Sequence, residues 1–254
     1  MKRKRNHGTP DPNEVPARRE GNARKFLHLY LKLHQSFYWR NIMKKIITIS
    51  REYGSGGRLI GKMVADQLGY TFYDKEIIDM AAKESGLSAD FIKKTEQNLS
   101  SGWLYNLLLG TSYAGTTGTA GQPVGQQNLP LADQVFNAER KVILDIAKKP
   151  CVIVGRCADY ILSNSDEIKK EDLLNVFIYA DRDAEIKRVA EIYHESDGDA
   201  KKQITTVNKH RANHYNTFTE NTWGDRKNYD MMIDSSSVGI EATAKWIVEL
   251  AKKS

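Results

Sequence analysis

Short apolar runs alternate along the chain with longer segments whose apolar residues recur every three or four positions. The runs have the length and β-branched content of buried strands, and the longer segments have the period of amphipathic helices. The predicted strands span residues 45–50, 70–73, 151–155, 173–179 and 229–233. The predicted helices span residues 59–68, 75–85, 131–149, 158–162, 180–194, 198–218 and 238–250. Strands that alternate with helices predict an α/β domain, in which helices cover both faces of a five-stranded parallel sheet.

The first predicted strand leads through a glycine cluster into the first predicted helix. Gly54, Ser55, Gly56 and Gly57 form the cluster, and Gly69 fits a helix C-terminal stop. Glycine allows the backbone to adopt positive φ and to approach an anion closely. The free N–H groups at a helix N-terminus, together with the helix dipole, attract phosphate. The segment therefore predicts a phosphate-binding element, with a tight turn in an ordinary α/β protein as the alternative.

The cluster departs from the P-loop pattern G-x-x-x-x-G-K-[ST]. If Arg58 takes the place of the lysine, Glu52 stands where the first glycine belongs. If Gly57 takes that place, the lysine is absent. Neither alignment supplies the Ser or Thr that would hold Mg²⁺, because Leu59 or Arg58 lies there.

Charge divides the chain into two parts. The whole chain has 254 residues, and 40% of them are hydrophobic, which is enough to form the core of one sizeable domain. Its net charge is +6. Residues 1–42 carry +7 and residues 43–254 carry −1. A nearly neutral domain argues against sequence-independent binding of duplex nucleic acid. We expect residues 1–42 to be a disordered basic extension that is not part of the native domain, with translation beginning at Met43; the alternative is a basic tail that contacts membrane or nucleic acid.

The remaining composition points to the cytoplasm. No apolar run approaches the length of about 18 residues that a membrane span requires, and no signal peptide is recognisable. Cys151 and Cys157 have a spacing that fits no zinc or redox motif, and we expect no disulfide. Two such cysteines suit a reducing cytoplasm.

Two charged residues directly follow predicted strands. Asp74 follows the second strand and Arg156 follows the third. Ligands of open parallel sheets bind beyond the carboxyl ends of the strands, so both residues are candidates for a site. A planar guanidinium can bind two phosphate oxygens at once. The alternatives are helix capping by Asp74 and a salt bridge at the rim of the sheet for Arg156.

Two further segments carry less regular patterns. Residues 86–130 form an insertion, in which residues 87–99 and 103–109 are candidate helices and residues 110–130 form a long loop. Long loops are usually functional or mobile, so this one is a flap over a ligand or a surface loop. His210 and His214 have helical spacing, but no carboxylate accompanies them as in zinc proteases, and we interpret the pair as a surface coincidence.

Four motifs resemble the cytidylate kinase-like family, which comprises relatives of bacterial cytidylate kinase among the P-loop nucleoside monophosphate kinases. In order, they are ISREYGSGG, GYTFYDKEII, VGR and WGDRKNYDMMIDSS. The resemblance covers residues 43–254. It implies a P-loop NTPase fold with strand order 2-3-1-4-5, an acceptor-binding insertion over residues 75–130 and a lid over residues 181–222.

The resemblance also implies an activity, namely ATP-dependent phosphoryl transfer to a small acceptor such as CMP or dCMP. Mg²⁺ would bind with ATP, largely through water and phosphate oxygens. Residues 54–58 would hold the phosphates of ATP, and Arg58 is a candidate to replace the missing lysine. Asp74 and Arg156 match acceptor-binding positions, and Lys75, next to Asp74, is a further candidate for the acceptor site. Arginines of the lid would stabilise the transferring phosphoryl group, and the candidates are Arg211, Arg188 and Arg182.

Three departures from the family pattern leave the acceptor open. Gly57 lies in the place of the lysine, Cys157 replaces the acid of a Gly-Arg-Asp motif, and Met80 stands where an acceptor-binding arginine is expected. Asp159 lies two residues beyond Cys157, and we do not expect it to replace that acid. The alternatives are a P-loop kinase of another small molecule and a non-catalytic nucleotide-binding regulatory protein.

Overall fold

The computed structural model describes residues 43–98 and 130–253. The chain divides into two units, Met1–Met43 and Lys44–Ser254, and the second contains every element described below. The predicted basic extension, the candidate helix at 103–109 and most of the loop at 110–130 lie outside the described residues.

The five strands form one parallel sheet in the order β2-β3-β1-β4-β5, which confirms the expected order. The strands are β1 (Ile46–Arg51), β2 (Thr71–Tyr73), β3 (Cys151–Val154), β4 (Leu173–Tyr179) and β5 (Met231–Asp234). In the central strand, Ile47 pairs with Val152 on one side and Leu174 on the other. The carboxyl ends of β1, β2 and β3 therefore lie at one edge of the sheet.

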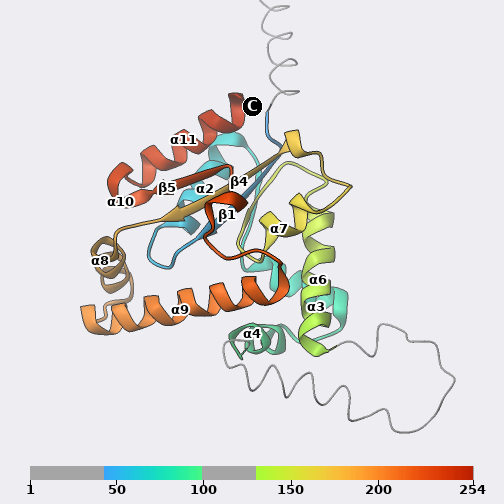
Figure 1. Ribbon diagram of the computed structural model, residues 1–254, viewed down its shortest axis with the longest axis horizontal. Helices are drawn as coiled ribbons and strands as arrows, with labels where there is room; N and C mark the ends of the chain where they lie inside the picture. Colours follow the sequence, from blue (N-terminus) through green and yellow to red (C-terminus); the bar gives the residue numbers. More distant parts are fainter. Residues whose placement is uncertain (1–42, 99–129, 254) are drawn as a thin grey trace, which may run out of the picture. The chain divides into compact units, whose positions relative to one another are not determined.

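Helices connect the strands and cover both faces of the sheet (Figure 1). They are α2 (Gly57–Leu68), α3 (Glu76–Ser85), α4 (Ala89–Asn98), α6 (Leu131–Ile146), α7 (Ala158–Ser163), α8 (Arg182–Tyr193), α9 (Asp197–Phe218), α10 (Ser235–Val238) and α11 (Ile240–Lys253). Two 3₁₀ turns, at Lys170–Asp172 and Arg226–Asn228, precede β4 and β5.

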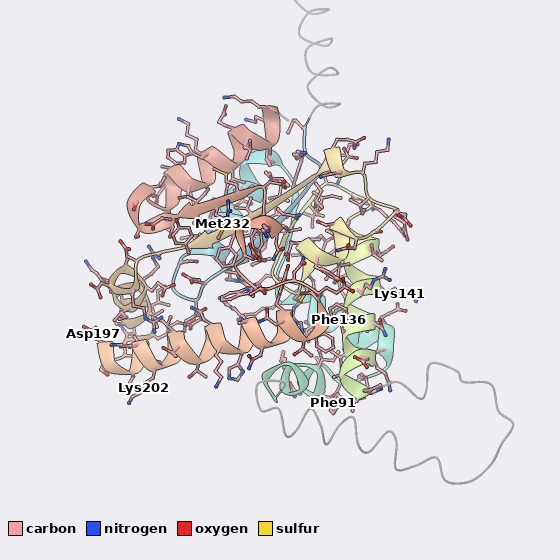
Figure 2. All side chains as sticks on the ribbon, viewed as in Figure 1. Phe91, Phe136, Lys141, Asp197, Lys202 and Met232 are labelled. Carbon is pink, nitrogen blue, oxygen red and sulfur yellow. The ribbon has the colours of Figure 1, made fainter. Side chains whose placement is uncertain are left out.

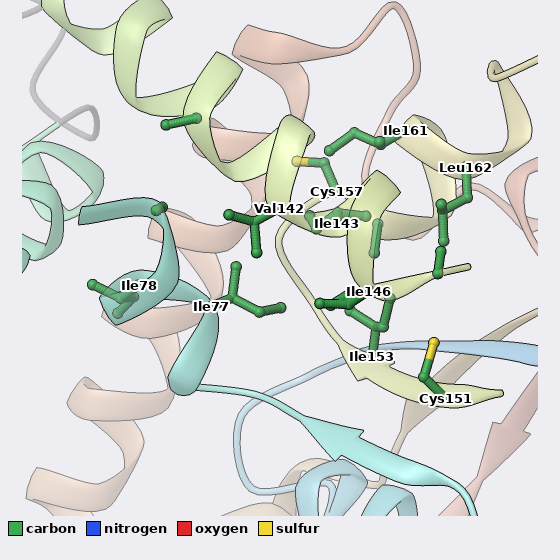
Figure 3. Close-up of a cluster of buried hydrophobic side chains, with 14 of the residues drawn as sticks. Ile77, Ile78, Val142, Ile143, Ile146, Cys151, Ile153, Cys157, Ile161 and Leu162 are labelled. Atoms are coloured by element: carbon green, nitrogen blue, oxygen red, sulfur yellow. The ribbon is translucent and has the colours of Figure 1, made fainter. Parts of the chain in front are cut away.

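Alternate side chains of the strands pack into two cores. Cys151 and Ile153 of β3 face α3, α6 and α7, where Ile77 and Ile143 are buried (Figure 3). Val152 of the same strand faces the other way, toward α2 and α11. Both faces of the strand are apolar and buried, as expected for a parallel sheet under two layers of helices.

Several predicted boundaries differ from the structure by a few residues, and two of these differences have a local cause. The helix predicted over 131–149 ends at Ile146, since Pro150 disfavours the helical conformation in the residue before it and the chain turns at 147–150. The strand predicted from residue 229 begins at Met231, because the 3₁₀ turn ends directly before Tyr229. Neither difference moves a candidate site residue.

Helix α9 crosses the carboxyl end of the sheet (Figure 1). Figure 2 shows Asp197 and Lys202 at one end of this helix and Phe136 of α6 near the other end. The ring of Phe136 stacks on Phe218 with 4.6 Å between ring centroids. The helix is thus anchored against α8 at its start and against α6 at its end, and it covers the edge where ligands of parallel sheets bind.

Candidate functional site

The glycine-rich segment forms the turn between β1 and α2, as the sequence predicts. Gly54 has φ of 87° and Gly56 has φ of 79°, both in the left-handed region that favours glycine. Helix α8 packs closely on this turn, because a Cβ atom added to Gly54 would lie 2.9 Å from Cβ of Glu185. The turn is therefore fixed in shape from the side of α8.

Internal hydrogen bonds hold the turn. The hydroxyl of the buried Ser55 donates to the carbonyl of Glu52 at 2.8 Å and accepts from the N–H of Gly57 at 3.3 Å. Ser235, at the end of β5, donates to the carbonyl of Ser55. Gly56 is the N-cap residue of α2 and has no side chain to cap the helix, so the first-turn N–H groups are suited to an anion. The hydroxyl of Ser55 holds the turn in place.

Two carboxyl groups lie on the α8 side of the turn. Burial first and the negative charge of the neighbouring Glu52 second raise the pKa of Glu185 to about 7. Burial also raises the pKa of Glu52. Arg182 donates to Glu185 at 3.2 Å and to Thr205 of α9 at 2.6 Å. Arg182 therefore ties α8 to α9.

Asp74 lies at the carboxyl end of β2, where its carboxylate contacts two arginines. Arg58 donates to it through Nε at 2.6 Å, and Arg51 lies 3.6 Å away. Its side chain makes no cap to α3, so the capping alternative is wrong for this residue. Lys75, the N-cap residue of α3, is exposed and does not line the adjoining cavity.

Arg156 lies at the carboxyl end of β3 in a strained backbone conformation. Arg156 has φ of 59° and Cys157 has φ of 53°, values that are uncommon for non-glycine residues and that concentrate at functional sites. The guanidinium forms an ion pair with Glu139 of α6, whose side chain is 0% exposed, while that of Arg156 is 16% exposed. Oε2 of Glu139 has no hydrogen-bond partner among the described residues.

These residues surround a cavity of about 630 Å³ beyond the carboxyl ends of the strands. Its floor comes from the ends of β1, β2 and β3 and its roof from α9. The polar and aromatic side chains in its wall are Ser50, Arg51, Asp74, Arg156, Thr206, His210, Arg211, His214, Tyr215 and Trp223. Three arginines against one aspartate make the wall positive, so it favours an anionic ligand.

The histidine pair lies in the wall of this cavity, so the interpretation as a surface coincidence is wrong. Nδ1 of His214 lies 3.5 Å from the thiol of Cys157. Burial, with the nearby charge of Arg156, lowers the pKa of His214 to about 3. The imidazole is therefore neutral at pH 7 and can exchange hydrogen bonds with an uncharged polar group.

Two of the predicted lid arginines reach the glycine turn. Arg188 donates to the carbonyl of Gly54. Arg211 donates to the carbonyl of Arg51 at 3.0 Å, lines the cavity, and lies 5.5 Å from the ring centroid of Tyr53. Burial lowers the pKa of Arg211. The structure thus brings both arginines to the boundary between the turn and the cavity.

Asp159 does not take the place of the missing acid in the cavity wall. It is buried, accepts from Tyr215 at 2.7 Å and from Ser50 at 3.3 Å, and does not line the cavity. The thiol of Cys157 lies in the wall instead. Met80 packs against the core of α3 and α6.

The structure brings together most of the predicted residues and adds some that the sequence did not single out. Asp74, Arg156 and Arg211 share the cavity, whereas Arg58 reaches its rim with a side chain that is 63% exposed. Arg51, Glu139, His214 and Trp223 were not predicted as site residues. Glu139 has a recognisable signal, since it interrupts the apolar face of α6.

Two classes of site find no support within residues 43–98 and 130–253. No group of three or more His, Cys, Asp or Glu side chains is arranged there to hold a metal ion. No helix of this part is long and apolar enough to cross a membrane. Cys151 and Cys157 are both buried free thiols, as expected.

Comparison with known families and structures agrees with this fold. The sequence matches the cytidylate kinase-like family over residues 46–237. No curated protein matches the chain. The structure resembles that of an uncharacterized protein from Eubacterium ventriosum ATCC 27560, with a TM-score of 0.59 and 24% identity over 82% of this chain and 99% of that chain. At this identity the likeness concerns the fold.

Two further solved structures are more distant. Shikimate kinase from Bacteroides thetaiotaomicron has a TM-score of 0.41 and 15% identity, over 81% of this chain and 97% of that chain. The protein TT1252 from Thermus thermophilus has a TM-score of 0.45 and 13% identity, over 84% of this chain and 99% of that chain.

Proposed function

The chain belongs to the cytidylate kinase-like family and has the α/β fold of P-loop kinases, and we propose that it transfers a phosphoryl group from ATP to a nucleoside monophosphate such as CMP or dCMP. The observation that carries this proposal is the arginine-lined cavity directly beside the glycine turn. A donor on the turn and an acceptor in the cavity would meet between them.

The glycine turn and the N-terminus of α2 would hold the phosphates of ATP. Gly54 and Gly56 give the turn its positive φ, and the first-turn N–H groups with the helix dipole would bind the oxygens. Mg²⁺, which neutralises phosphate charge in such reactions, would enter with ATP. Ser55 keeps its hydroxyl for the turn, so water and phosphate oxygens would supply most of the ligands of the ion.

The cavity would hold the acceptor. Arg156 would bind the phosphate of the monophosphate through its guanidinium, while Glu139 fixes its orientation. Asp74, held by Arg58, would contact the rest of the acceptor at the end of β2, whereas Lys75 beside it would act on the acceptor only from outside the cavity. The neutral imidazole of His214 and the indole of Trp223 would face the uncharged part of the ligand.

Arginines of α8 and α9 would stabilise the charge that moves between the two sites. Phosphoryl transfer depends on positioning and on neutralisation of negative charge. Arg188 already hydrogen-bonds to the glycine turn and Arg211 to the end of β1 directly before it, so a phosphoryl group passing from the turn to the cavity would meet both. Helix α9 would also exclude water, which would otherwise accept the phosphoryl group.

A kinase of another small acceptor is the second candidate, and a specific observation favours it. The cavity presents the thiol of Cys157 where the family motif has an acid. Met80 stands where the family has an acceptor-binding arginine, and its side chain packs against the core. A non-catalytic nucleotide-binding protein is the third candidate, which the absence of the P-loop lysine favours.

Steady-state turnover separates the three candidates. The protein would be assayed with ATP-Mg²⁺ and each common nucleoside monophosphate, then with other small hydroxyl and phosphate acceptors. Turnover of CMP or dCMP supports the proposal. Turnover of a different acceptor alone would favour the second candidate, and ATP binding without any turnover would favour the third. Arg156→Ala should lose activity, whereas Arg140→Ala, at an exposed position of α6, should keep it.

A further inference from the structure

Two of the three departures from the P-loop pattern in this chain, at positions 51 and 57, involve residues that touch. When Gly57 is aligned with the lysine, Gly56 takes the second glycine and Arg51 stands where the first glycine belongs. A Cβ atom added to Gly57 would lie 2.6 Å from Cβ and 3.0 Å from Cγ of Arg51. The stem of Arg51 therefore fills the space where a side chain at position 57 would begin.

The side chain of Arg51 then runs from the turn toward the cavity. A Cβ atom added to Gly155 would lie 1.8 Å from its Nη1, so the guanidinium passes directly over the end of β3. Its other terminal nitrogen lies 3.6 Å from Asp74, a distance too long for a hydrogen bond. Arg51 lines the cavity together with Arg156 and Arg211. Glycine at both 57 and 155 leaves room for this path.

The position of the guanidinium suits a phosphoryl group. The side chain of Arg51 is 19% exposed, and burial lowers its pKa, while the negative charge of Asp74 opposes the change. A cation that is poorly hydrated gains more from an anionic ligand than an exposed one does. Arg58, in contrast, is 63% exposed and donates its Nε–H to Asp74.

We propose that Arg51 is the catalytic cation that replaces the P-loop lysine, reaching from the position of the first glycine to the phosphoryl group that is transferred. This inference rests on the proposed function. This chain has Arg51 where the pattern has glycine, and Gly57 where the pattern has lysine. The two changes together keep one positive side chain in the same space. The absence of the lysine is then compatible with activity. The role of Arg58 is to hold the carboxylate of Asp74.

Restoring the P-loop pattern tests the proposal. Arg51→Gly should lower kcat by at least about 100-fold, the range for loss of a group that stabilises transition-state charge. Gly57→Lys alone should not raise kcat, because Arg51 occupies the space. The double variant Arg51→Gly/Gly57→Lys should recover at least about tenfold of the loss. A double variant no better than Arg51→Gly would overturn the proposal, because a purely structural role is not rescued from position 57.

A second pair of variants covers the case in which the double variant does not fold. Arg51→Lys keeps the charge and Arg51→Met keeps much of the stem without it. The lysine variant should retain at least about tenfold more activity than the methionine variant, and equal losses would overturn the proposal. Arg58→Met compares the two arginines: a loss larger than that of Arg51→Met would return the role to Arg58.

Binding measurements keep this proposal separate from the proposed function. If the wild-type protein phosphorylates no acceptor, the proposed function fails, but calorimetric titration with ATP-Mg²⁺ and with adenosine still tests Arg51. Arg51→Met should weaken binding of ATP-Mg²⁺ by about tenfold or more and leave adenosine binding unchanged. Unchanged ATP affinity would overturn the assignment of Arg51 to the phosphates.

Discussion

Single residues at this site carry charge in places that water hardly reaches. Arg156 pairs with the fully buried Glu139, and Asp74 pairs with Arg58 and Arg51. Removing one partner of a buried ion pair leaves the other charge uncompensated, which costs far more than the pair contributes as a whole. The site therefore depends on partners that do not touch the ligand themselves.

Glu139→Gln tests whether this carboxylate positions Arg156. Burial raises the pKa of Glu139 to about 8. At pH 9, where the carboxylate is ionised, the substitution removes the negative charge opposite a buried guanidinium, so we expect the free energy of unfolding to fall by about 3 kcal/mol or more. The KM for the acceptor should rise by at least about tenfold, while the KM for ATP stays unchanged. Urea denaturation and steady-state kinetics measure the two effects.

The matched control for this prediction is Glu84→Gln. Glu84 forms an ion pair with Lys141 on the surface, where the two side chains are 38% and 71% exposed. Exposed pairs contribute about 0–1 kcal/mol, so little change is expected. Equal effects of the two substitutions, or an unchanged acceptor KM in Glu139→Gln, would contradict a positioning role.

Glu185 makes stability depend on pH in a predictable direction. Burial first and the charge of Glu52 second raise its pKa from 4.5 to about 7 in the folded chain. The folded state thus holds this proton more tightly than the unfolded state, so stability falls as pH rises from about 4.5 to about 7. Glu185→Gln cannot ionise, and between pH 5 and pH 8 it should gain on the order of 2 kcal/mol relative to wild type.

Denaturation at pH 5, 6, 7 and 8 checks this prediction. Glu249→Gln, at an exposed position of α11, serves as the control and should follow the wild-type curve. A Glu185→Gln curve that runs parallel to wild type at all four pH values would show that this carboxyl does not titrate in the range.

The residues that the sequence identified are those with a strong local signal. Asp74 and Arg156 follow buried strands, and the edge of a parallel sheet is where such residues meet a ligand. Arg51 has the same placement at the end of β1, but the P-loop pattern directed attention to Arg58. Glu139 lies four residues after Val135 on an apolar helix face. This position predicts that the carboxyl group has a buried cationic partner, but it does not identify that partner as Arg156.

Among the elements, the sequence predicts the strands, the core helices and also the two lid helices α8 and α9, but it does not predict where the lid helices lie. Helix α9 buries only three of its residues fully, Ala200, Ile204 and Tyr215, because it covers a cavity. Its charged sequence is equally typical of a solvated helix, so periodicity could not predict its place. Its contacts with the glycine turn, through Arg211, arise from tertiary structure alone.

The packing of α8 on the glycine turn predicts an effect of Gly54→Ala. The substitution would place Cβ 2.9 Å from Cβ and 3.0 Å from the carbonyl oxygen of Glu185, in a backbone conformation with φ of 87°. We expect destabilisation beyond the roughly 1–2 kcal/mol of left-handed strain, together with at least about tenfold weaker ATP binding. Thermal denaturation and calorimetric titration measure both.

Gly86→Ala separates backbone strain from packing. Gly86 has φ of 73°, and an added Cβ would meet no atom within 4 Å. This variant should show the cost of strain alone and keep the ATP affinity of the wild type. If Gly54→Ala and Gly86→Ala give the same stability and the same ATP affinity, the close packing of α8 on the turn does not contribute to ATP binding.

Over the whole described unit, the alternation of strands and helices determines the fold class, but the order of the strands has a different origin. Periodicity predicts five parallel strands without ordering them, and the order 2-3-1-4-5 came from the family resemblance. The cavity joins the ends of β1, β2 and β3 to a helix more than a hundred residues later than β1. Such a site depends on the three-dimensional arrangement, which is why His214 and Trp223 escaped prediction.

The central claim is that the γ-phosphoryl group of ATP moves to an acceptor held in the arginine-lined cavity. Single-turnover transfer of radiolabel from [γ-³²P]ATP-Mg²⁺ to CMP and dCMP, by wild type, Arg156→Ala and Arg140→Ala, tests it most directly. We predict labelled CDP or dCDP with wild type and Arg140→Ala, and at least about 100-fold slower labelling with Arg156→Ala. Label that appears only in inorganic phosphate, or transfer that Arg156→Ala leaves unchanged, would contradict the account.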